Sequence, residues 1–122
     1  MGKVVISING QFIFMSNIME AAKVFKLTES VEYSDGAVVS KTIVKKSTGN
    51  ITLFAFDEGE GLAEHSSPYD ALVQLLEGAA EITIGGNPHR LQAGDNIILP
   101  ANIPHSLKAT GRFKMMLTMI KG

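Results

Sequence analysis

The stretch that decides the fold is Gly94-Asp95-Asn96-Ile97-Ile98-Leu99-Pro100-Ala101-Asn102-Ile103-Pro104-His105. Its first half predicts a turn, where the Asp95 side chain can bond nearby backbone, followed by a short apolar strand over residues 96–99. Pro100 and Pro104 cannot donate to a sheet ladder, so they suit a loop after that strand. The stretch therefore predicts a strand and a proline-bounded loop that together place His105.

A second stretch lies upstream, where His65-Ser66-Ser67-Pro68-Tyr69-Asp70-Ala71 leads into an apolar strand and ends at Gly78. Alternation along an extended chain predicts that His65 and Ser67 point to the same face. Glycine at 78 and at 94 fits turns that require a permissive φ. Both stretches thus combine a histidine, a strand and a turn glycine.

Together the two stretches resemble the paired motifs of small single-domain cupins. Gly94, Pro100 and His105 fall in register with the second motif, Gly-x5-Pro-x-Gly-x2-His-x3-Asn. Asn102 stands at the motif's second glycine, and asparagine also tolerates a left-handed turn. Ala109 replaces the final asparagine of the motif.

The first motif, His-x-His-x3or4-Glu-x6-Gly, is matched only in part. His65 and Gly78 match it, whereas Ser67 stands at the second histidine and Ala71 at the glutamate. The resemblance implies an all-β fold, a double-stranded antiparallel β-barrel of the jelly-roll type with an internal pocket. It also implies that half of the usual metal ligands are missing.

The resemblance places four residues in the pocket: His65, Ser67, Ala71 and His105. It implies that the two histidines face each other across the pocket and are the remaining metal ligands. Two alternatives stay open for a cofactor. One is a divalent transition metal held by two imidazoles and completed by water or a ligand. The other is no metal, with both histidines hydrogen-bonded to a small molecule or water.

Several other residues near the motifs are predicted to have structural roles and not to take part in the pocket. Alternation turns Glu64, Asp70 and Gln74 away from the pocket side, which predicts solvent or interface positions. We expect Tyr69 at a rim or interface. His89 follows a turn and is expected to be an exposed loop residue. Met115, Met116 and Met119 are expected to fill the core or an interface rather than line an adaptable pocket. These methionines and the residues above complete the set of site candidates.

The remaining sequence predicts short strands over residues 38–46, 51–56, 71–76, 81–84 and 113–120, with turn residues between them. In the last strand Phe113, Met115, Leu117 and Met119 fall on one face. We expect one domain, with residues 31–122 forming the barrel, motifs at 59–78 and 94–109, and residues 1–30 forming an extension.

The extension carries the strongest local hairpin signal. Asn9-Gly10 lies between the β-formers of residues 4–8 and 11–15, and a short helix or turn is expected between residues 16 and 27. An isolated hairpin is marginal in water and needs another surface. Because the barrel motifs begin later, this surplus apolar sequence favours a homodimer.

Composition narrows the function classes. The chain has 122 residues, 45% of them hydrophobic, and a formal net charge of −1, so no basic excess points to nucleic acid or an anionic membrane. With no cysteine, disulfides, thiolate metal sites and a cysteine nucleophile are excluded. No apolar run is long enough to span a bilayer, and we expect a cytoplasmic protein.

Two functions remain. The first is binding of a small molecule in the barrel pocket, with little or no catalysis. The alternative is a metal-dependent enzyme, such as a small oxygenase or isomerase, that uses His65 and His105 as ligands. The fold does not choose between them, and the missing ligands favour the first. The sequence does not identify the ligand or substrate.

Overall fold

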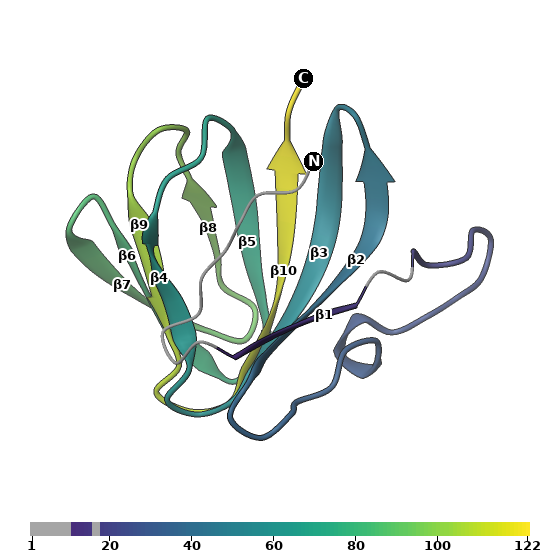
Figure 1. Ribbon diagram of the computed structural model, residues 1–122, viewed down its shortest axis with the longest axis horizontal. Coiled ribbons are helices and arrows are strands. Elements are labelled where there is room, and N and C mark those ends of the chain that lie inside the picture. Colours follow the sequence, from purple (N-terminus) through teal and green to yellow (C-terminus); the bar gives the residue numbers. More distant parts are fainter. Residues whose placement is uncertain (1–10, 16–17) are drawn as a thin grey trace.

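The computed structural model describes residues 11–15 and 18–122. Ten strands and one short 3-10 helix follow one another along the chain (Figure 1). In order these are β1 (Phe12–Met15), η1 (Leu27–Glu29), β2 (Val38–Lys46), β3 (Gly49–Phe56), β4 (Gly61–His65), β5 (Asp70–Glu77), β6 (Ala79–Ile84), β7 (Asn87–Gln92), β8 (Asn96–Leu99), β9 (His105–Lys108) and β10 (Phe113–Ile120). The all-β prediction is therefore confirmed.

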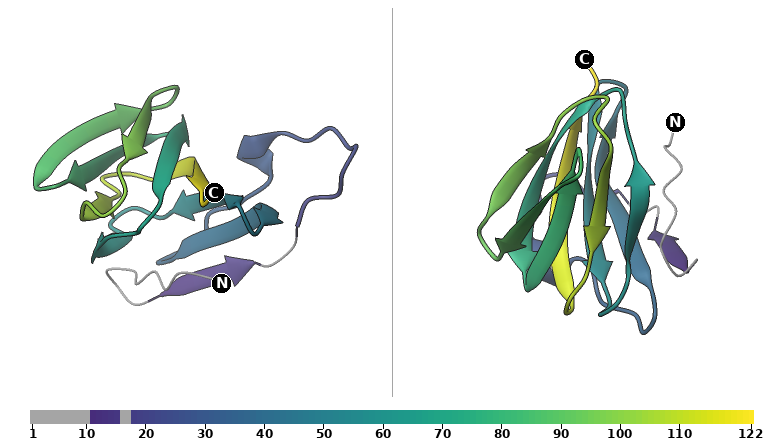
Figure 2. Two further views of the ribbon diagram at one scale, coloured as in Figure 1. Left: turned by 90° about the horizontal axis from the view of Figure 1, so that it is seen from above. Right: turned by 90° about the vertical axis from the view of Figure 1, so that its left-hand side faces the viewer.

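The strands form two facing sheets, seen edge-on in the right-hand view of Figure 2. The larger sheet has six strands in the order β1-β2-β3-β10-β5-β8, and the smaller has four in the order β4-β9-β6-β7. All neighbouring strands pair antiparallel except β1 and β2. This arrangement is the expected jelly roll, and the space between its sheets holds the core.

The core lies between the sheets because the strands alternate in burial. On β10, Phe113, Met115 and Met119 are buried on the predicted inner face. The rings of Phe56 and Phe113 stack with centroids 4.3 Å apart, and Phe54 lies 6.0 Å from Phe56. Burial of these aromatic rings supplies a large share of the hydrophobic stabilisation.

Three strands, β4, β7 and β9, were not among the predicted ranges. β4 follows the glycine-rich acidic loop and is too short for its alternation to show. β7 begins Asn87-Pro88-His89-Arg90, and all of these residues are exposed because β7 is the edge of the smaller sheet. Proline is tolerated at such an edge. His89 is therefore exposed as expected, but it lies on a strand rather than in a loop.

The segment after β1 does not become an α-helix. Residues 18–26 contain a turn at Ala21–Ala22, where Ala22 has a φ of +63°, and the 3-10 helix begins only at Leu27. Of the two alternatives, helix or turn, the described part shows the turn. Two of its apolar side chains, Ile18 and Phe25, are exposed, so they contribute little burial that would stabilise a helix. Packing of an apolar face supplies most helix stability in proteins.

The expected N-terminal hairpin lies partly outside the described residues. Residues 4–8 and the Asn9-Gly10 turn belong to that part. The strand expected over residues 11–15 is present as β1, and it pairs with β2 of its own chain, from Phe12 with Val38 to Met15 with Lys41. β1 therefore has a sheet to join without a second copy, so this strand alone gives no reason for a dimer.

Residues 27–36, here called the strap, hold a second apolar cluster against the outer face of the larger sheet. The Tyr33 hydroxyl donates to Glu77 Oε2 at 2.6 Å, and the Lys114 ammonium donates to the Thr28 carbonyl at 2.6 Å. Burial, followed by the bond to Glu77, raises the pKa of Tyr33. The Lys114 and Arg112 cations each lie 5.0 Å from the Tyr33 ring centroid. These contacts fix the strap to β5 and β10.

A carboxylate cluster joins the strap to the barrel and makes stability depend on pH. Asp57 accepts from the Gly36 N–H at 2.7 Å and from Arg112 Nε at 2.8 Å. These bonds lower the Asp57 pKa to about 2, with the Gly36 N–H as the largest cause. Because the unfolded value is about 3.9, this contribution to stability is present above about pH 4 and is lost as the pH falls towards 2.

We expect Asp57→Asn to remove that dependence. Urea unfolding at a series of pH values should show wild-type stability falling more steeply than that of Asp57→Asn between about pH 4 and pH 2. Glu58→Gln, a change at the exposed neighbouring residue, is the control and should follow the wild type. Parallel curves for wild type and Asp57→Asn would contradict the expectation.

Candidate ligand pocket

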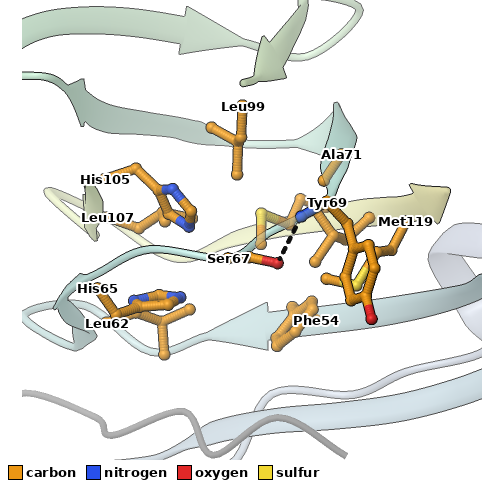
Figure 3. Close-up of a pocket in the computed structure, with 12 residues that line it drawn as sticks. Phe54, Leu62, His65, Ser67, Tyr69, Ala71, Leu99, His105, Leu107 and Met119 are labelled. Carbon is orange, nitrogen blue, oxygen red and sulfur yellow. Dashed lines mark hydrogen bonds between the residues drawn. The ribbon is translucent and has the colours of Figure 1, made fainter. Parts of the chain in front are cut away.

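A small cavity of about 40 Å³ lies between the two sheets (Figure 3). Its walls are mostly aliphatic and aromatic side chains drawn from both sheets. The lining residues are Phe54, Leu62, His65, Ser67, Tyr69, Ala71, Leu99, His105, Leu107, Met115, Leu117 and Met119. The four pocket residues named from the sequence, His65, Ser67, Ala71 and His105, are all in this set.

The two histidines lie side by side on neighbouring strands of the smaller sheet. His65 ends β4 and His105 begins β9, and the two residues are register partners. Their ring centroids are 4.5 Å apart with an interplanar angle of 68°. The expectation that they face each other across the pocket is wrong in this respect, because β4 and β9 are adjacent rather than opposite. The rings are nonetheless close enough to contact one ligand.

Each imidazole is oriented by a backbone carbonyl two residues earlier in the chain. His65 Nδ1 lies 2.8 Å from the Ala63 oxygen, and His105 Nδ1 lies 3.3 Å from the Ile103 oxygen. A carbonyl oxygen can only accept, so Nδ1 carries the proton in both bonds. In a neutral His65 ring, Nε2 is therefore the acceptor. The sequence could not reveal these orienting groups, because they are backbone atoms.

Ser67 lines the pocket, but strand alternation with His65 is not the reason. It lies beyond the end of β4, so strand alternation with His65 does not place it. It is buried where the chain crosses from the smaller to the larger sheet, and its hydroxyl accepts from the Tyr69 N–H at 3.3 Å. Figure 3 shows Ser67 between the histidine pair and Tyr69. Ser67 therefore supplies a central polar group to an otherwise apolar wall.

The loop that leads into His105 is held by the segment that carries Ser67. Asn102 adopts a φ of +66°, which confirms that it serves as the motif's turn residue. Its N–H donates to the Ser67 carbonyl at 2.6 Å, and the Ala101 N–H donates to Asp70 Oδ1 at 2.8 Å. Asp70 points out of the pocket as expected, but it also positions this loop, a role the sequence did not indicate.

The other candidates divide between the pocket and the surface. Tyr69 lies at the pocket rim, with its ring 5.8 Å from the Lys121 ammonium. Met115 and Met119 line the pocket as well as filling the core, so the expectation that they would only fill it is wrong. Met116, one residue away on β10, packs in the cluster on the opposite face of the sheet.

The side chains present do not fit a closed metal centre. Catalytic sites for zinc, and those of similar metals, take three protein ligands beside an open position. The described residues contain no cluster of three histidine, cysteine, aspartate or glutamate side chains that could hold a metal. At the two remaining ligand positions of the cupin motif stand Ser67 and Ala71, a hydroxyl and a methyl group.

Comparison with known proteins identifies the family. The family model described as "Cupin domain" matches residues 52–121, more than half of the chain. The chain belongs to the cupin family. The match includes both motifs from His65 onward, so the incomplete ligand set belongs to a true cupin barrel.

Solved structures similar to this cupin support the same fold. A conserved protein of unknown function from Streptococcus pyogenes superposes with a TM-score of 0.81 at 41% identity, over 88% of this chain and 95% of the other. A cupin superfamily protein from Desulfitobacterium hafniense has a TM-score of 0.81 at 26% identity, over 87% and 97% of the two chains. Neither description states a ligand or a reaction.

One curated relative is Protein SchB of Streptomyces halstedii. It is 26% identical over 87 residues, which span 70% of this cupin and 63% of SchB. The chain thus matches less than two thirds of that relative's length. Among the described residues, none of the helical segments is long and apolar enough to cross a membrane.

Proposed function

We propose that this cupin binds a small, mostly apolar molecule in the barrel pocket, without a metal and without catalysis as its main role. The observation that carries the proposal is the composition of the lining. Among the described residues that line it, the polar groups are His65, Ser67, His105 and the Tyr69 hydroxyl, and the other lining side chains are apolar. Ligand sites commonly combine apolar walls with a few placed polar groups.

The polar groups of the pocket indicate which chemical groups a ligand would carry at the end that contacts them. A neutral His65 ring offers an acceptor at Nε2, because its Nδ1 is committed to the Ala63 carbonyl. A ligand hydroxyl or amine would suit this end, and the Ser67 hydroxyl can both donate and accept beside it. The described lining residues include no carboxylate, so they offer no group that would attract a cationic ligand.

The apolar walls of the pocket indicate the size and shape of the rest of the ligand. Met115, Met119 and Leu117 from β10 cover one side of the cavity, and methionine side chains adapt readily to irregular shapes. The volume of about 40 Å³ exceeds the ~10–15 Å³ that one water requires. The ligand is therefore a compact molecule, unless the methionines move to admit a larger one.

The test uses the methionine methyl groups as reporters. Protein labelled with ¹³C at its methionine methyls is titrated with a library of fragments that pair a small apolar body with one hydroxyl or amine. Binding fragments should shift the Met115 and Met119 signals and leave Met116, on the opposite face of β10, unchanged. Shifts confined to Met116, or no shift with any fragment, would refute the proposal.

The histidine variants then test the polar end. We expect His65→Ala and His105→Ala each to weaken a fragment's affinity by up to about tenfold, the value of one hydrogen bond of about 0.5–1.5 kcal/mol. His89→Ala, a change at an exposed histidine on β7, is the control and should bind normally. Equal affinity in the wild type and both pocket variants would show that the imidazoles do not contact the ligand.

A further inference from the structure

Two connections meet at the end of the barrel where the pocket histidines lie. One is the crossing segment, residues 66–69, which joins β4 to β5, and the other is the entry loop, residues 100–104, which joins β8 to β9. Ala71 of β5 pairs with Leu99 of β8 in an antiparallel register. Asp70, the first residue of β5, is therefore placed beside the start of the entry loop.

The hydrogen bonds of the entry loop tie it to the crossing segment. Two of its five residues are prolines, so the loop has three N–H groups. The Asn102 N–H donates to the Ser67 carbonyl at 2.6 Å. The Ala101 N–H donates to Asp70 Oδ1 at 2.8 Å, and the Ile103 N–H donates back within the loop at 3.4 Å. Two of the three donors thus hold the loop from outside, and these two bonds are called the clasp.

Of the two bonds in the clasp, only the one to Asp70 depends on a side chain. Asp70 is exposed and is not among the residues that line the pocket. Hydrogen bonds to an ionised acceptor are shorter and stronger than bonds between neutral groups. A substitution at Asp70 can therefore loosen the entry loop without removing any side chain from the pocket.

The entry loop also carries the carbonyl that orients His105. His105 Nδ1 lies 3.3 Å from the Ile103 oxygen. Ile103 itself lies between two anchors, which are the clasp at Asn102 and the bond from the Gly85 N–H to the Pro104 carbonyl at 2.8 Å. N–H···O bonds are commonly about 2.7–3.2 Å long, so the bond to His105 is already a long one. A small displacement of the loop would therefore break it.

His65 provides a comparison, because the carbonyl that orients it is not part of the entry loop. His65 Nδ1 lies 2.8 Å from the Ala63 oxygen, and both residues belong to β4. The rings of His65 and His105 lie on the same side of the cavity, with their centroids 4.5 Å apart (Figure 3). A change in the entry loop should therefore alter the His105 ring and spare the His65 ring.

The position of the proton on a neutral imidazole determines which hydrogen bonds the ring can make. With the proton on Nδ1, the ring has an acceptor at Nε2, whereas the other tautomer has a donor there. The hydrogen bond that one nitrogen makes sets the state of the other nitrogen. The Ile103 carbonyl therefore selects the form of His105 that accepts at Nε2.

We propose that Asp70 is a positioning residue for the pocket, which it does not itself line. By holding the entry loop, Asp70 keeps the Ile103 carbonyl on His105 Nδ1 and so keeps the proton on that nitrogen. The pocket then favours ligands that donate a hydrogen bond over ligands of the same shape that only accept one. The effect of Asp70 on His105 requires no ligand, whereas the preference among ligands rests on the proposed function.

The first test reads the tautomer in the protein without ligand. Long-range ¹H–¹⁵N correlation spectra at about pH 8, where imidazole is ordinarily neutral, show which nitrogen carries the proton. In Asp70→Ala, the ratio of Nδ1–H to Nε2–H forms of His105 should fall by roughly 2- to 10-fold, the equivalent of one lost neutral hydrogen bond. His65 should keep its ratio. An unchanged His105, or equal changes in both rings, would overturn the proposal.

Two further variants separate positioning from a general loss of stability. Asp70→Asn keeps an oxygen that can accept from the Ala101 N–H, so it should retain the wild-type ratio of His105. Asp95→Ala removes a similar bond at the opposite end of β8, where the Asp95 carboxylate accepts from the Gln92 N–H at 2.9 Å. That variant should leave His105 unchanged. An Asp95→Ala effect as large as that of Asp70→Ala would overturn the proposal.

The second test measures the preference among ligands with two probes of one shape. Butan-2-ol both donates and accepts, whereas butan-2-one only accepts, and binding of each is followed by the methyl signals of Met115 and Met119. The wild type should bind the alcohol more tightly, and Asp70→Ala should lower the ratio of the two affinities by roughly 2- to 10-fold. An equal ratio in both proteins would refute the link between tautomer and ligand choice. If the wild type binds neither probe, the proposed function is at fault, and the His105 tautomer still decides the role of Asp70.

Discussion

Restoring the two missing ligands, with Ser67→His and Ala71→Glu together, should turn the pocket into a divalent metal site. Both positions line the same cavity as His65 and His105, so the added imidazole and carboxylate would join the two existing rings. Three nitrogens and one carboxylate oxygen form a set that suits Ni²⁺, Co²⁺ or Zn²⁺. We expect Ni²⁺ affinity to rise by roughly 10³-fold, since each tenfold needs about 1.4 kcal/mol and added ligands contribute several kcal/mol.

Titration calorimetry with Ni²⁺ on protein without an affinity tag measures the change. The control is Ser66→His with Gln74→Glu, which adds the same two groups at neighbouring positions that do not line the pocket. That control should bind Ni²⁺ no better than the wild type. If the two double variants behave alike, or if the wild type already binds as tightly, the interpretation of the pocket as a site with half its ligands is wrong.

The second large effect concerns the core. Phe56 is completely buried, and its ring stacks on Phe113 and lies near Phe54. We expect Phe56→Ala to lower the free energy of unfolding by about 3–5 kcal/mol, through lost burial and the cavity left behind. Because domains of this size are stable by only about 5–15 kcal/mol, much of the protein would unfold at moderate temperature.

Urea unfolding followed by circular dichroism gives the value, with Ile103→Ala as the control at an exposed apolar position. The control should change stability by less than about 0.5 kcal/mol. A Phe56→Ala loss below about 1 kcal/mol would mean that the three rings do not form the centre of the core. Pocket variants such as His65→Ala should lie between these limits, because the pocket already contains empty space.

The sequence predicted the fold well because its strands follow simple rules. β2, β8 and β10 begin and end at the expected residues, since alternating or apolar runs there end at prolines, glycines or charged turns. β4 and β7 were missed for opposite reasons: β4 is short and β7 is a polar edge strand. Apolar and polar residues alternate along a strand only when one of its faces is buried. The first four residues of β7 are exposed on both faces, so they carry no such pattern.

The four residues named from the sequence all line the candidate cavity, whereas the arrangement of the histidines was missed. Motif spacing selected the two histidines and Ser67, but it could not state which strands are neighbours, so the pair was expected on opposite walls. The pairing of β4 with β9 joins two segments that lie far apart in the sequence, so no local pattern indicates that they are neighbours. The carbonyls of Ala63 and Ile103 and the loop contact of Asp70 were missed because backbone partners leave no pattern in a sequence.

The pairing of β1 with β2, the only parallel one among the described strands, marks the weakest edge of the larger sheet. Two-residue turns join β2 to β3 and β6 to β7, so each of these hairpins can form from residues that are close in the sequence. β1 meets β2 only after residues 16–37 have closed a long loop, and parallel pairs are slightly weaker per residue. β1 also lies at the edge of the larger sheet and pairs with β2 alone, so it should detach first in the native state. Amide hydrogens of Phe12–Met15 should exchange with solvent well before those of β3 and β10, at the centre of the sheet.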